Sequence, residues 1–158
     1  MIQPERILLA AQGYLELGMY RESLREVGLL SMRLQDSSEA LEIKALGLMG
    51  IRAWQEGLEV AQRLKRIAPD EAGGYIHSAY CLHELGQTRE ALDLLLQGPE
   101  ALKTRAVFFY NVACYQTRLG ELDAAWKMLQ KAFDMDASLR QSAKRDPDLE
   151  AIKSKLGR

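Results

Sequence analysis

The sequence repeats itself at a step of 34 residues. At this step small residues recur at some positions and apolar residues recur at others. The small column holds Ala11, Ala45, Ala79 and Ala113, and an apolar column holds Leu24, Leu58, Leu92 and Trp126. A period of this length is typical of stacked helix pairs, because one pair cannot bury its apolar face alone and needs a neighbour on each side. The period therefore predicts a linear array of repeats.

Within each period the apolar residues follow helical spacing, as in Leu122, Trp126, Leu129 and Phe133. No stretch alternates in and out as a strand would, so we predict an all-α fold. The four prolines, Pro4, Pro69, Pro99 and Pro147, stand where helices begin or end. The first helices of the pairs are expected near 5–17, 38–50, 72–85 and 106–119, and the second near 21–34, 55–67, 89–97 and 123–135.

This pattern resembles the tetratricopeptide repeat (TPR), a helix pair with a large residue at position 4, small residues at positions 8, 20 and 27, and a turn glycine at position 15. The fourth unit carries the resemblance best, with the run Tyr110–Tyr115, then Leu119-Gly120 and Ala124-Ala125. The resemblance implies a right-handed α-solenoid of four helix-turn-helix repeats. They would cover residues 4–37, 38–71, 72–105 and 106–139 of a single domain, 1–158, with a bacterial-type capping tail at 140–158.

Two places depart from the regular unit. Arg52 stands in the column that holds Gly18, Gly86 and Gly120, where a left-handed residue closes the first helix of each pair. We expect Gly50 to take over this role. The third unit has Gly98-Pro99, which should cut its second helix short.

The end of the chain predicts a C-terminal capping helix. Asp146 is suited to the N-cap and Pro147 to the first helical position. An apolar stripe then follows at helical spacing, formed by Leu149, Ile152 and Leu156 and ended by Gly157. We expect this stripe to cover the edge of the fourth repeat, because a terminal unit otherwise leaves its apolar face in water.

Composition excludes several classes of partner. Twenty-one basic and 22 acidic residues give a net charge of -1, so we expect no nucleic-acid or membrane partner. No apolar run could span a bilayer, and the first residues lack the basic region of a signal peptide, which predicts a cytoplasmic protein. Cys81 and Cys114 are too few for a disulfide framework and are expected to be free thiols.

The sequence contains no catalytic motif, so we predict no enzyme and no cofactor. One constellation of metal-ligating residue types is present. His77, Cys81 and His83 share one predicted helix, and Cys114 lies on the equivalent helix of the next unit. A metal-handling protein using His77, Cys81 and Cys114 is thus an alternative. Structural zinc sites usually carry closely spaced cysteine pairs, so we interpret these cysteines as small buried hydrophobes and assign no metal site.

In stacked helix pairs the first helices line the concave surface. This groove is predicted to be apolar with an acidic N-terminal half, as expected for a non-catalytic scaffold that binds an apolar peptide or helix of another protein, with or without basic residues. A secretion-type chaperone for a specific partner is an alternative, and the chain could be a monomer or a homodimer. The family resemblance adds Asn111, because an asparagine at this position often bonds the backbone of a bound peptide. The predicted groove comprises Leu8, Gln12, Leu15, Glu39, Glu42, Leu46, Met49, Ile76, Tyr80, His83, Tyr110, Asn111, Cys114 and Arg118.

Overall fold

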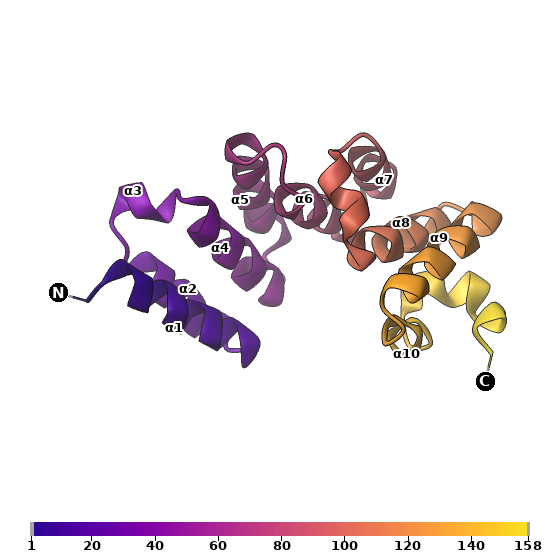
Figure 1. Cartoon of the computed structure of the whole chain (residues 1–158), viewed down its shortest axis with the longest axis horizontal. Coiled ribbons are helices and arrows are strands. Elements are labelled where there is room, and N and C mark those ends of the chain that lie inside the picture. The colour runs from indigo at the N-terminus through magenta and orange to yellow at the C-terminus, as the bar shows by residue number, and fades with distance from the viewer. Residues whose placement is uncertain (1, 158) are drawn as a thin grey trace.

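The computed structural model describes residues 2–157, which form helices and no β-strand. Four antiparallel helix pairs follow one another along an elongated α-solenoid, with the two ends of the chain at opposite ends of the array (Figure 1). No helix in the described residues is long and apolar enough to cross a membrane. The pairs are α1 (Pro4–Glu16) with α2 (Tyr20–Gly28), α4 (Ser38–Gly50) with α5 (Trp54–Ile67), α6 (Gly73–Glu84) with α7 (Thr88–Leu96), and α8 (Ala106–Arg118) with α9 (Leu122–Met135).

The small residues of the repeat lie where helices pack most closely. Ala11, Ala45, Ala79 and Ala113 all have an exposed fraction of 0%. In the first pair the Ser23 hydroxyl donates to the carbonyl oxygen of Ala11 at 2.8 Å, which joins α2 to α1. Larger side chains at such crossings would overpack the core, so the period of small residues sets the spacing of the helices.

The second helix of the first pair is shorter than predicted. It ends at Gly28, and a separate turn, α3 (Met32–Gln35), follows. The prediction of one helix over 21–34 is therefore wrong. Leu30 turns inward to 4% exposure beside Val27, and the Gln35 side chain donates to the Leu30 carbonyl oxygen at 2.8 Å. Glycine is a weak helix former, and burial of Leu30 outweighs one more helical turn.

The turn between α4 and α5 also differs from expectation. Arg52 itself takes the left-handed conformation, with φ 61°, as Gly18, Gly86 and Gly120 do in the other turns. Gly50 remains helical and has another role, because a side chain there would overlap the ring of Tyr20. The turn geometry is thus imposed by the array, against the preference of the arginine.

Replacing Arg52 by glycine should therefore stabilise the protein. A non-glycine residue in this conformation costs roughly 1 kcal/mol, and Arg52 is exposed, so little packing is lost. We expect Arg52→Gly to raise the free energy of unfolding by about 1 kcal/mol in urea denaturation, and the reverse change Gly86→Arg to lower it by a similar amount. If both variants changed the free energy of unfolding in the same direction, this account would be contradicted.

After α7 the chain turns at Gly98-Pro99 as predicted. A short 3₁₀ helix, η1 (Glu100–Thr104), inserts Leu102 into the core at 1% exposure and leads into α8. Beyond α9 lie α10 (Leu139–Ala143) and a second 3₁₀ helix, η2 (Pro147–Leu156).

The capping segment has the predicted ends but a tighter helix. Asp146 accepts the backbone N–H of Asp148 at 2.9 Å through Oδ1, and Gly157 closes the segment with φ 77°. Leu149, Ile152 and Leu156 are all buried. The segment η2 is a 3₁₀ helix, in which residues three apart lie on one face, so the first two apolar side chains point the same way.

Candidate functional site

The tail occupies the C-terminal part of the concave surface. A helix that continued the array would pack mainly on the preceding second helix, as α4 packs on α2 and α6 on α5, whereas η2 packs mainly on α8. Figure 1 shows this last segment, in yellow, folded back against the final helix pair. The apolar stripe of the tail therefore covers residues of α8 that were predicted to line an open groove.

Polar contacts fasten the tail to two first helices. Asp146 Oδ2 accepts from the Tyr110 hydroxyl at 2.7 Å and from the Cys114 thiol at 3.7 Å. Asp148 Oδ2 lies 2.9 Å from His83 Nε2, and Asp148 Oδ1 lies 3.7 Å from Arg118 Nε. The structure thus brings together four predicted groove residues, but their polar atoms are directed to the protein's own tail.

The electrostatics follow from this burial. Desolvation and the bond to Asp146 raise the pKa of Tyr110 far above its usual range, and desolvation with the charges of Asp146 and Asp148 does the same for the pKa of Cys114. At neutral pH, in the structure as it stands, both groups are protonated and act as hydrogen-bond donors. Asn111 is also largely buried, at 7% exposure, and borders the same cavity as the tail residues. A partner would reach little of Tyr110, Asn111 and Cys114 while the tail is in place. Ile76, at 6% exposure, belongs to the hydrophobic core.

The N-terminal half of the concave surface stays open. An apolar hollow of about 500 Å³ lies between the first two pairs and α6, where the Trp54 and Tyr80 rings pack 5.8 Å apart. Leu8 lies further back, partly buried against the N-terminal core, and Arg118 and Glu39 are exposed. The hollow is lined by Gln12, Leu15, Glu16, Tyr20, Leu46, Met49, Gly50, Trp54 and Tyr80.

The two aromatic residues of this lining that begin second helices were missed by the sequence analysis. Tyr20 and Trp54 begin the second helices α2 and α5, so a rule that admits only first-helix residues omits them. They stand one period apart, directly after the turn, and both are aromatic. That recurrence is the signal that could have placed them at the rim of the groove.

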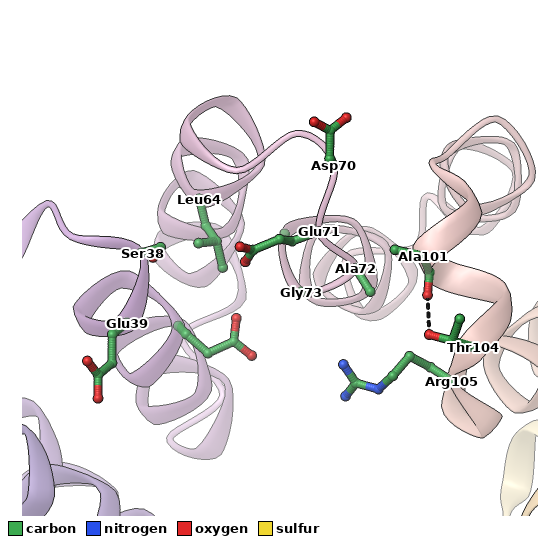
Figure 2. Close-up of a pocket in the computed structure, with 12 residues that line it drawn as sticks. Ser38, Glu39, Leu64, Asp70, Glu71, Ala72, Gly73, Ala101, Thr104 and Arg105 are labelled. Carbon is green, nitrogen blue, oxygen red and sulfur yellow. Dashed lines mark hydrogen bonds between the residues drawn. The ribbon is translucent and has the colours of Figure 1, made fainter.

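A second hollow, of about 460 Å³, lies where α4, α6 and the segment before α8 meet. Figure 2 shows Arg105 extending into it from the η1 side and Glu71 from the loop before α6. Its charged lining is mostly acidic: Glu39, Glu42, Asp70 and Glu71 against Arg105. Burial raises the pKa of Glu42, but the 2.6 Å contact with His77 and the charges of His77 and Arg105 outweigh it, so the net shift is downward. Glu42 is therefore a carboxylate at neutral pH.

The structure does not bring together the three residues of the metal-handling alternative. His77 pairs with Glu42, and Cys81 is buried facing Gly57, so His77, Cys81 and Cys114 do not converge. Burial and the charge of Glu84 raise the pKa of Cys81 to about 11, which leaves an unreactive thiol. Within residues 2–157, the only His, Cys, Asp or Glu side chains with three donor atoms mutually within 4.8 Å are those of Cys114, Asp146 and Asp148.

Comparisons with known proteins bear on the fold. No protein-family model matches the sequence, and no curated protein is significantly similar to it. Among solved structures, a thermophilic TPR protein of Thermus thermophilus superposes with a TM-score of 0.74 at 19% identity, over 98% of this chain and 81% of that one. The protein has the fold of a TPR-type repeat protein. MamA from Desulfovibrio magneticus is similar at 17% identity, with a TM-score of 0.72 over 96% of this chain and 89% of that one. A second MamA structure has a TM-score of 0.69 at 16% identity, over 87% of this chain and 80% of that one. These TPR structures share the architecture across nearly the whole array.

Proposed function

We propose that this TPR chain is a non-catalytic, cytoplasmic scaffold that binds a segment of another protein in the open N-terminal half of its concave surface. The single observation that carries the proposal is the apolar hollow around Met49, Trp54 and Tyr80, which the protein's own tail leaves open. Grooves of this kind receive amphipathic helices through a few apolar anchors. The chain would act as one domain with repeats at 4–37, 38–71, 72–105 and 106–139.

The chemistry of the partner follows from the two hollows. Leu15, Leu46 and Met49 offer apolar contacts, and Trp54 and Tyr80 offer the aromatic surface that tends to dominate binding energy. The acidic hollow, with Glu39 and Glu71, lies at the N-terminal ends of α4 and α6, the two helices that also carry Met49 and Tyr80 nearer their C-terminal ends. A peptide with Leu, Met or aromatic anchors and a Lys or Arg about 15 Å from them would complement both.

Selection from a displayed random-peptide library against the full chain tests this proposal. We expect enrichment of amphipathic sequences with a basic residue set apart from the apolar anchors, and binding that weakens as salt rises. For a selected peptide, Tyr80→Ala and Met49→Ala should each reduce affinity by roughly 5–30-fold in fluorescence anisotropy, the equivalent of about 1–2 kcal/mol.

Met135→Ala is the matched control, because Met135 is an exposed methionine at the end of α9, outside the hollow. It should leave affinity unchanged. If a selected peptide lost affinity equally for Met135→Ala and Met49→Ala, or for neither variant, the binding surface would lie outside the hollow.

A further inference from the structure

The junction between the tail and α8 holds a thiol and two carboxylates. Cys114 comes from α8, and Asp146 and Asp148 come from the turn that begins η2. One donor atom from each lies within 4.8 Å of the other two, and Cys114 Sγ is 3.7 Å from Asp146 Oδ2. These residues lie far apart in sequence and meet only because the tail folds back.

The 3.7 Å between Cys114 Sγ and Asp146 Oδ2 is close to the spacing of two ligands of a tetrahedral metal ion, and the other donor pairs lie within 4.8 Å. With zinc–sulfur and zinc–oxygen bonds of about 2.3 Å and 2.0 Å, two ligand atoms lie about 3.5 Å apart. The donor set also selects the metal. A thiolate is a soft ligand that Ca²⁺ and Mg²⁺ avoid, whereas zinc accepts sulfur and carboxylate together.

A separate observation points to a missing ligand in the same place. The cluster borders a cavity of about 330 Å³ that Tyr115 also lines. The Tyr115 side chain is buried at 1% exposure, and its hydroxyl has no hydrogen-bond partner in the described structure. Buried polar groups are rarely left unpaired, so the Tyr115 side chain, which borders this cavity, carries a hydroxyl that lacks a partner.

Neighbouring side chains already orient the carboxylates. Asp148 accepts from His83 Nε2 at 2.9 Å, because a carboxylate can only accept, and the Thr88 hydroxyl lies 2.9 Å from His83 Nδ1 and fixes the ring. Tyr110 donates to Asp146. Arg118 also faces Asp148, but its side chain is 58% exposed and can turn into water. Such outer hydrogen bonds hold metal-binding carboxylates in position.

We propose that Cys114, Asp146 and Asp148 bind one zinc-type divalent cation that fastens the tail to α8. On binding, the Cys114 thiol loses its proton to solvent as the sulfur–metal bond forms. Water from the adjoining cavity occupies the fourth position. His83 is a positioning residue that holds Asp148. This site is independent of the peptide groove, so each proposal can fail without the other.

Titration of the full chain with Co²⁺ and Zn²⁺ tests the site. We expect one ion per chain and, with Co²⁺, a sulfur-to-cobalt charge-transfer absorption band. Competition with a chromogenic chelator measures the affinity for Zn²⁺. Cys114→Ser should abolish the band and weaken Zn²⁺ binding at least tenfold. Cys81→Ser, which changes the other buried cysteine, should retain both.

Asp148→Asn extends the test without removing the N-cap that Asp146 provides. It should weaken Zn²⁺ binding at least tenfold while the circular dichroism spectrum stays unchanged. Zn²⁺ should also raise the melting temperature of the wild type more than that of Cys114→Ser, because an ion that binds only the folded state stabilises it. Absence of a stoichiometric ion, or equal Zn²⁺ affinity in wild type and Cys114→Ser, would overturn the proposal.

Discussion

Leu149→Ala is expected to lower the free energy of unfolding by about 2–5 kcal/mol, the range for truncating a fully buried leucine. Leu149 has an exposed fraction of 0% and lies on η2, where the tail packs against α8. Its loss leaves a cavity between the tail and the concave surface. Urea denaturation followed by circular dichroism measures the effect.

Ser154→Ala is the control, because Ser154 is exposed on the same segment and should change stability by less than about 0.5 kcal/mol. The Leu149 variant should also bind more of a hydrophobic dye, since loosening the tail uncovers Tyr110 and Tyr115. If the two variants had the same denaturation midpoint, the tail would not be part of the cooperative unit, and the groove would be open along its full length.

Gly74→Ala is expected to destabilise the protein by about 1–3 kcal/mol, although alanine is the better helix former. Gly74 lies in the first turn of α6, where the helix crosses α5. A Cβ at this position would lie 2.5 Å from the backbone nitrogen of Lys65 and 2.6 Å from its Cα. Backbone cannot turn aside as a flexible side chain can, so the two helices would have to separate.

A glycine-to-alanine substitution at a position with free space should have the opposite effect on the free energy of unfolding. Gly13 lies inside α1, and a Cβ there would meet no atom within 4 Å. Gly13→Ala should therefore stabilise the protein by about 0.5–1 kcal/mol through helix propensity alone. Thermal denaturation of the pair separates the two effects. A gain in stability for both variants would show that α5 and α6 do not approach as closely as the structure places them.

The lining of the proposed groove was only partly predictable. Leu15, Leu46, Met49 and Tyr80 line the open hollow, as their places on first helices suggested. Cys114 stands one period after Tyr80, in the same column of the repeat, yet it is buried beneath the tail. Tyr110, one helical turn earlier on the same helix, is also buried there and donates to Asp146. A repeat pattern describes every unit as if its neighbours were the same, so it cannot show that one unit is covered by a segment outside the period.

The sequence by itself determined the helices, their pairing and the close crossings, because these depend on local spacing and on one small residue such as Ala79 per period. Only the tertiary structure decided where the tail lies. Its stripe could have packed on α8 or on α9, and the choice depends on shape and on long-range contacts such as that of Tyr110 with Asp146. Long-range packing likewise ends α2 at Gly28 and holds Arg52 left-handed, because burial and the turn geometry of the array outweigh local preference.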